Sequence, residues 1–172
     1  MFLLLMRHGI AVELEELRRL PQGRHARDVD RPLSPIGIRK TKRVARGLRT
    51  LKIRPDVVLH SGLLRARETA EIVAKELQPR RPGLVVTEAL AHWAEPTTLF
   101  EVLVKQKARV IVAVGHCPHV DRFIALACDA TKRLITSMGK AGVICLALQD
   151  SGRPAGRIVW MLPPKLLRRL AR

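Results

Sequence analysis

Aromatic residues are scarce in this sequence: three phenylalanines, two tryptophans and no tyrosine make up 3% of its 172 residues. Proteins that bind single-stranded nucleic acids commonly stack the bases on aromatic side chains. Such stacking surfaces are hard to build from this composition, so we expect no specific nucleic-acid partner.

Cysteine is also scarce, and long apolar runs are missing. Cys117, Cys128 and Cys145 form an odd, widely spaced set without the paired spacing of metal sites, so we expect reduced thiols and a cytoplasmic protein. No run approaches the roughly 18 apolar residues that a membrane-spanning helix needs. The apolar run Phe2–Met6 is too short for a signal-peptide core and no small-residue cleavage site follows it, so we expect no export signal.

Acidic residues are few relative to basic ones. The chain has 15 Asp and Glu against 32 Lys and Arg, a formal net charge of +17. This excess favours an anionic substrate, or a polyanion that contacts the basic surface. The alternative is that the charge only keeps the protein in solution. The hydrophobic fraction of 47% suits a folded core, and the length suits one domain over residues 1–172.

Apolar runs typical of strands alternate with helical patterns along the chain. Ser34 is a good N-cap with Pro35 at the first helical position, so we expect a helix from Pro35 to about Leu51, with Val44 and Leu48 facing inward. This alternation predicts an open α/β sheet. The predicted strands are Phe2–Met6, Asp56–Ser61, Leu84–Glu88, Ala108–Gly115 and a hairpin of Gly142–Leu148 with Arg157–Leu162 around the turn Asp150–Pro154. The other predicted helices are Glu13–Leu20, Gly62–Leu77, Pro96–Lys105 and Val120–Cys128, followed by a basic amphipathic tail, Pro163–Arg172, that forms either a capping helix or a membrane or RNA contact.

Four consecutive predicted strands end in polar side chains. These side chains are His8, Ser61, Glu88 and His116. Ligands of open α/β sheets collect beyond the carboxyl ends of the strands, so we expect these groups at one site. Arg7 ends the first strand beside His8, where an anion or a structural carboxylate would explain its planar fork. Arg65 lies in the first turn of a predicted helix, where the helix dipole disfavours a cation unless an anion is bound nearby.

Arg7, Arg65 and two histidines around one point would suit a tetrahedral dianion. Guanidinium forks bind phosphate oxygens in pairs, and a histidine supplies a further donor. A neutral histidine that is held at one ring nitrogen by a carbonyl could also attack phosphorus with the other nitrogen. The sequence lacks a phosphate-binding glycine loop ending in Lys-Ser or Lys-Thr, so it gives no support to nucleoside-triphosphate hydrolysis.

Two other chemistries find less support. The candidate zinc ligands are His8, His92, His116 and His119. Their spacing lacks a compact ligand pattern, and Arg7 would repel a dication, so we expect no metal. A cysteine phosphatase would need an arginine six positions after its cysteine, and Phe123 stands six positions after Cys117.

Four segments resemble, in order, the motifs of a known family. They are Leu5-Met-Arg-His-Gly9, Arg31-Pro-Leu-Ser-Pro-Ile-Gly37, Ser61–Thr69 and Val114–Val120. These segments are similar to the motifs of the histidine phosphatase superfamily, also called phosphoglycerate-mutase-like, and of its short branch, the phosphohistidine phosphatases. The resemblance spans almost the whole chain. It implies a single three-layer α/β/α domain with a mostly parallel central sheet, acting without a cofactor.

The resemblance also implies roles for particular residues. His8 would be the nucleophile that becomes phosphorylated, and Arg7, Arg65 and His116 would hold the phosphoryl group. Glu88 is the nearest match to the general acid of the superfamily, although the proline and glycine expected near it are missing.

Two further positions lie within the matching segments. Ser61, at the end of its predicted strand, is expected to contribute a phosphate contact. Gly62 stands where the family usually has proline.

The chemistry of the leaving group leads to a functional hypothesis. Expelling an alkoxide from an ester needs a general acid, which contributes about 10²–10⁴-fold, whereas imidazole leaves readily because its nitrogen is protonated near pH 6.5. A poorly supported acid therefore favours phosphohistidine in a protein as the substrate. The alternatives are a phosphomonoesterase acting on a small phosphorylated or polyanionic metabolite, and a noncatalytic polyanion-binding module.

The basic segment with Arg18, Arg19, Arg24 and Arg27 would either line a mouth beside the site or form a solvated flap.

Overall fold

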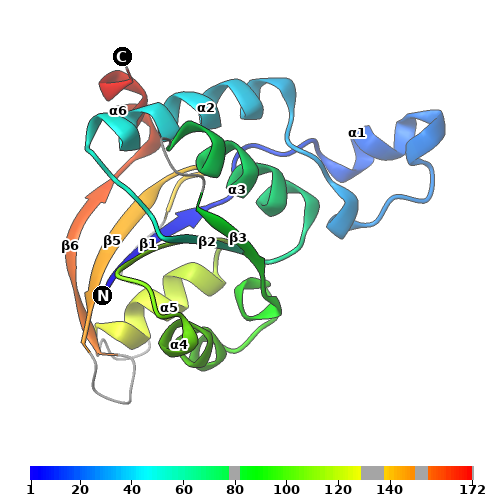
Figure 1. The fold of residues 1–172 in the computed structure, drawn as a ribbon. Helices are drawn as coiled ribbons and strands as arrows, with labels where there is room; N and C mark the ends of the chain where they lie inside the picture. Colours follow the sequence, from blue (N-terminus) through cyan, green and yellow to red (C-terminus); the bar gives the residue numbers. More distant parts are fainter. Residues whose placement is uncertain (78–81, 129–137, 150–154, 172) are drawn as a thin grey trace.

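Six strands form one sheet through the centre of the protein (Figure 1). The computed structural model describes residues 1–77, 82–128, 138–149 and 155–171, and within these the strand order is β3-β2-β4-β1-β5-β6. β1 to β4 run parallel, whereas β5 pairs antiparallel with β1 and with β6. The predicted mostly parallel sheet is thereby confirmed. The strands are β1 (Phe2–Arg7), β2 (Val57–His60), β3 (Gly83–Val86), β4 (Val110–Gly115), β5 (Val143–Leu148) and β6 (Gly156–Leu162).

Helices cover both faces of the sheet. On one face lie α2 (Pro35–Thr50), α3 (Leu64–Glu76) and α6 (Pro164–Leu170), and on the other lie α4 (Pro96–Lys105) and α5 (His119–Ala127) (Figure 1). Successive side chains of β1 point to opposite faces, as in any strand. Leu3 and Leu5 therefore pack with α4 and α5, while Leu4 and Met6 pack with α2 and α3. This arrangement confirms the predicted three-layer α/β/α architecture.

The element boundaries follow local sequence signals. The hydroxyl of Ser34 accepts a hydrogen bond from the Gly37 N–H (3.1 Å), which caps α2, and Val44 and Leu48 are fully buried as predicted. The described ends of the helices and strands lie within about two residues of the predicted ones. The predicted turn Asp150–Pro154 lies outside the described residues.

The C-terminal helix α6 packs against α2. Leu167 is fully buried, and Nη2 of Arg43 on α2 donates to the Arg168 carbonyl (3.1 Å). These contacts favour the capping helix over the membrane or RNA contact considered for the tail. In the described part of the chain, every helix is too short or too polar to cross a bilayer.

The chain between β1 and α2 projects from the sheet as an arm, defined here as residues 13–30 (Figure 1). It contains α1 (Leu14–Arg19) and two 3-10 helices, Pro21–Gly23 and Asp28–Asp30. The four basic side chains predicted to line a mouth or to form a flap are exposed. Among the described residues, these side chains form hydrogen bonds or ion pairs only with other residues of the arm. This placement favours the solvated flap.

Candidate active site

The carboxyl ends of β1, β2 and β4 bring three predicted site residues together. His8 follows β1, Ser61 follows β2 and His116 follows β4, and all three are buried. The His8 backbone N–H donates to the Gly115 carbonyl (3.0 Å), which ties the two strand ends together. The ring centroids of His8 and His116 lie 4.9 Å apart.

His8 is held as a neutral ring with one nitrogen directed at a cation. Its Nδ1 lies 2.7 Å from the Gly9 carbonyl, which can only accept, so Nδ1 carries the proton. Nε2 accepts a hydrogen bond from Nε of Arg65 (3.3 Å), which requires its lone pair to be free. Burial lowers the pKa of His8 to about 3, with the nearby charges of Arg65 and Arg7 adding to the effect against the Gly9 carbonyl. At neutral pH, Nε2 is therefore unprotonated.

His116 is also buried and neutral. Its Nε2 lies 2.7 Å from the Ser61 hydroxyl. Burial, together with the neighbouring His8 and Arg65, lowers the pKa of His116 to about 2. Its Nδ1 is buried and has no hydrogen-bond partner among the described residues. Such an atom costs about 1–3 kcal/mol unless a ligand satisfies it.

Arg7 and Arg65 lie at the same carboxyl ends of the strands as His8 and His116. Arg65, in the first turn of α3, is 5% exposed and contacts His8 directly. Arg7 donates from Nη1 to the Met138 carbonyl (2.8 Å), while its buried Nε has no partner in the described part of the chain. Unsatisfied nitrogens on both Arg7 and His116 fit a pocket for an anion.

Gly9 allows the backbone after His8 to lie close against α2 and α3. A Cβ at this position would clash with the hydroxyl of Thr41 and touch Leu33. The Gly9 N–H donates to Oγ1 of Thr69 on α3 (3.0 Å), and its carbonyl holds His8. A side chain here would thus displace the residue that orients the proposed nucleophile.

Gly62 has a backbone conformation that the proline expected from the resemblance could not adopt. Its φ is +84°, in the left-handed region that proline cannot reach. Its N–H, which proline would lack, donates to Nδ1 of His60 (3.2 Å). The turn before Arg65 is therefore built for glycine.

Among the described residues, Glu88 makes no hydrogen bond or ion pair with the other predicted site residues. It begins the 3-10 helix Glu88–Leu90 after β3, a strand whose side chains are exposed, and it is exposed itself. Within the described residues its carboxylate makes no hydrogen bond or ion pair. Its role as a general acid stays a prediction.

Asp28, which the sequence did not single out, is the carboxylate that contacts the site. Its Oδ2 lies 2.8 Å from Nη2 of Arg65, and its backbone carbonyl accepts from Nη1 (2.7 Å). Asp28 lies just before Arg31, the first residue of the second matching segment. This nearness in sequence is the one signal that could have pointed to Asp28, because the residues around it have the pattern of an exposed loop.

Cys117 lies beside His116 but is not activated. Burial and the neighbouring Asp121 carboxylate raise the pKa of its thiol to about 12, so almost no thiolate exists at neutral pH. Replacing Cys117 with serine is expected to leave phosphatase turnover within about threefold of the wild type, because the chemistry needs no thiolate. Steady-state phosphate release measures this, and loss of more than about 100-fold would reopen a role for the thiol.

Metal ligands do not cluster in the described residues. No group of three or more His, Cys, Asp or Glu side chains there is placed to hold an ion. His92 lies near His116, with ring centroids 5.8 Å apart, but it is exposed and stacks edge-on with Trp93 instead.

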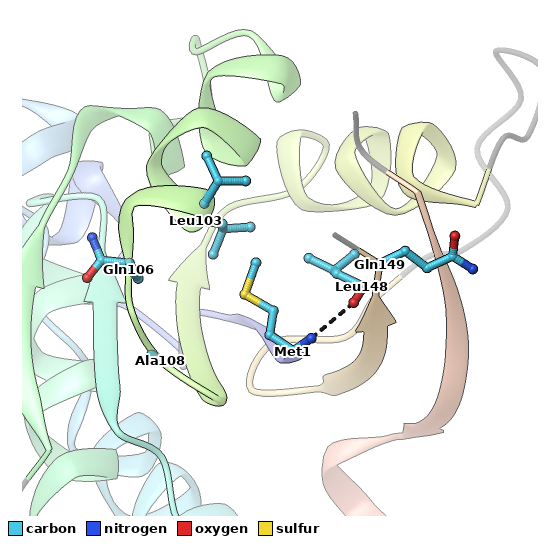
Figure 2. A pocket seen from close by; sticks show the side chains of 7 residues that line it. Met1, Leu103, Gln106, Ala108, Leu148 and Gln149 are labelled. Atoms are coloured by element: carbon cyan, nitrogen blue, oxygen red, sulfur yellow. Dashed lines mark hydrogen bonds between the residues drawn. The ribbon is translucent and has the colours of Figure 1, made fainter. Parts of the chain in front are cut away.

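A separate pocket lies at the other end of the strands, beside the amino end of β1 (Figure 2). Met1, Leu103, Gln106 and Leu148 are among its lining residues, and the N-terminal amine donates to the Leu148 carbonyl (3.0 Å). Met1 precedes β1 and His8 follows it, so the length of the strand puts roughly 20 Å between this pocket and the histidines. The pocket is therefore not part of the candidate site.

Comparison with known proteins places these motifs in a family. A family model described as the histidine phosphatase superfamily (branch 1) matches residues 3–95. An uncharacterised protein of Picosynechococcus sp. is 35% identical over 151 residues, which cover 85% of this chain and 84% of that protein.

Solved structures share the fold. The protein histidine phosphatase SixA, complexed with tungstate, superposes with a TM-score of 0.78 at 24% identity, over 97% of this chain and 99% of that chain. The alpha-ribazole phosphatase from Shigella flexneri superposes with a TM-score of 0.70 at 16% identity, over 95% and 97% of the two chains. At these identities the likeness establishes the architecture and leaves the substrate open.

Proposed function

Because this chain belongs to the histidine phosphatase superfamily, we propose that it is a phosphatase that removes the phosphoryl group from phosphohistidine in a protein. The observation that carries the proposal is the neutral His8 ring, with Nδ1 on the Gly9 carbonyl and Nε2 facing Arg65. An attacking nitrogen needs a free lone pair, and a transferring phosphoryl group needs cations beside it. Nε2 carries no proton, and its lone pair becomes available for attack once a phosphoryl oxygen takes over the Arg65 N–H that it accepts.

The reaction proceeds in two displacements on phosphorus. In the first, Nε2 of His8 bonds to phosphorus while the P–N bond of the substrate breaks, and the departing imidazole takes up a proton from solvent. In the second, water attacks phosphorus, the bond to Nε2 breaks and inorganic phosphate leaves. Arg7, Arg65 and Nδ1 of His116 hold the phosphoryl oxygens in both steps, and Ser61 orients the His116 ring.

The carboxylates near the site support phosphohistidine over an ester. Glu88 is exposed and unpartnered in the described residues, and Asp28 is engaged by Arg65. An alkoxide would need a proton from an acid at the site, worth about 10²–10⁴-fold. Imidazole needs less help, because its conjugate acid has a pKa near 6.5.

A small phosphate ester is the second candidate substrate. The similar structures include the alpha-ribazole phosphatase from Shigella flexneri, which is named for a small molecule. The net charge of +17 would attract any anionic substrate, whether protein or metabolite.

Comparing turnover on the two substrate classes tests the proposal. We expect kcat/KM for a phosphohistidine-carrying phosphotransfer domain to exceed that for phosphate monoesters by about 100-fold or more, since only the esters need an acid. The experiment uses the wild-type protein without added metal, with phosphoserine and alpha-ribazole 5′-phosphate as the esters, because both would release an alkoxide. A preference for an ester would replace the first candidate by the second. If no substrate is hydrolysed, steeply salt-dependent binding of polyphosphate that survives His8→Ala would support the binding module instead.

A further inference from the structure

Arg65 is held at both ends of its guanidinium group. Nε donates to Nε2 of His8 (3.3 Å), while Nη1 and Nη2 donate to the backbone carbonyl and the Oδ2 of Asp28 (2.7 and 2.8 Å). A guanidinium offers five N–H donors in a planar fork, so donors remain for phosphoryl oxygens after these three contacts. Asp28 therefore fixes the plane and direction of the fork relative to His8.

Asp28 is in turn fixed by a second arginine. Nη1 of Arg31 lies 3.0 Å from Oδ1 of Asp28, and Arg31 also donates to the Val12 carbonyl (2.8 Å) and to Glu13 (2.9 Å). Burial alone would raise the pKa of Asp28, but the hydrogen bonds from Arg31 and Arg65 outweigh it, and the pKa lies below its usual value. The carboxylate is thus a rigidly placed negative charge at the base of the arm.

This negative charge acts on the pocket as well as on Arg65. Oδ2 of Asp28 lies 2.8 Å from Nη2 of Arg65, and Nε of the same guanidinium lies 3.3 Å from Nε2 of His8, so only the width of one guanidinium group separates the carboxylate from His8. A carboxylate at the rim of an anion pocket repels a bound dianion. Tight binding of the product would slow turnover, because free phosphate must leave before the next substrate binds.

We infer that Asp28 is a positioning residue for Arg65 that also weakens the hold of the pocket on inorganic phosphate. This inference rests on the proposed phosphatase function. Asp28 orients the fork toward His8 Nε2 for the transfer step and partly offsets the charge of the fork once phosphate has formed. Its removal changes rate and product affinity in opposite senses.

The test compares Asp28→Asn with Asp30→Asn. Both variants remove one negative charge from the same 3-10 helix, but Asp30 is exposed and pairs only with the exposed Arg27 among the described residues. In Asp28→Asn we expect kcat to fall about tenfold and the inhibition constant of inorganic phosphate to fall about three- to tenfold, that is, tighter product binding. In Asp30→Asn we expect both constants to stay within about twofold of the wild type.

A conservative variant separates charge from position. Asp28→Glu keeps the charge but moves it by one methylene, so phosphate inhibition is expected to return to within about twofold of the wild type while kcat stays reduced. A purely structural role for Asp28 would instead weaken phosphate binding and lower kcat together. That result, or an unchanged phosphate affinity in Asp28→Asn, would overturn the inference.

Calorimetric titration with inorganic phosphate keeps the two proposals apart. A wild-type protein that neither binds phosphate nor hydrolyses phosphohistidine would contradict the proposed function itself. A wild-type protein that does both, with an Asp28→Asn variant that binds phosphate no more tightly, would contradict only the role of Asp28.

Discussion

Replacing His8 with glutamine is expected to lower kcat for phosphohistidine hydrolysis by about 10⁴-fold or more. The amide nitrogen of glutamine has no lone pair available for attack, so only direct attack by water in the pocket would remain. Phosphate release from a phosphotransfer domain measures the loss. During turnover of the wild type, mass spectrometry of the peptide that contains His8 should detect a phosphorylated histidine, and in the variant it should not.

His25→Gln is the matched control for this experiment. His25 lies on the arm and is exposed, so the same chemical change there should leave kcat within about twofold of the wild type. An unchanged circular dichroism spectrum and melting curve for His8→Gln would show that the protein still folds. Residual activity above about 1%, or phosphate found on His116 instead, would contradict the assignment of the nucleophile.

The meeting of His8 with His116 was predictable because it depends on strand direction. Phe2–Arg7 and Val110–Gly115 are almost wholly apolar, and such runs fit parallel strands covered on both faces. Parallel strands end at one edge of the sheet, so residues that follow them come together. The structure confirms this expectation with the 4.9 Å separation of the two rings.

The two carboxylates were harder to place because neither position depends on a regular pattern. Asp28 reaches Arg65, which lies 37 positions further along the chain, because the arm folds back toward α3, and the residues around Asp28 carry no periodic signal. Glu88 follows a predicted strand, but β3 is an exposed edge strand and the chain turns at once into a 3-10 helix. The end of a predicted strand therefore indicates that a residue lies near the carboxyl ends of the strands. It does not indicate in which direction the side chain of that residue points.

Replacing Arg65 with alanine is expected to lower kcat/KM by about 10²–10³-fold, whereas Arg67→Ala should stay within about twofold of the wild type. Both arginines lie in the first turns of α3, which makes them a matched pair. Arg65 is 5% exposed and contacts His8, while the Arg67 side chain is 54% exposed and forms only a loose ion pair with Glu71 (3.6 Å). Steady-state kinetics with the phosphohistidine domain measures the difference. Equal losses in the two variants would contradict the phosphate pocket.

The Arg65→Ala variant should also bind phosphate more weakly for a second reason, which a double variant can test separately. Without the guanidinium, Arg31 is the one partner of the Asp28 carboxylate left among the described residues, and the carboxylate would repel the phosphoryl group. We expect Arg65→Ala/Asp28→Asn to bind inorganic phosphate more tightly than Arg65→Ala alone, while kcat does not recover because the fork is still missing. Calorimetry on both variants measures the difference in affinity. Equal phosphate affinity in the two would show that the Asp28 charge does not act on the pocket, and the loss in Arg65→Ala would then come from the missing fork alone.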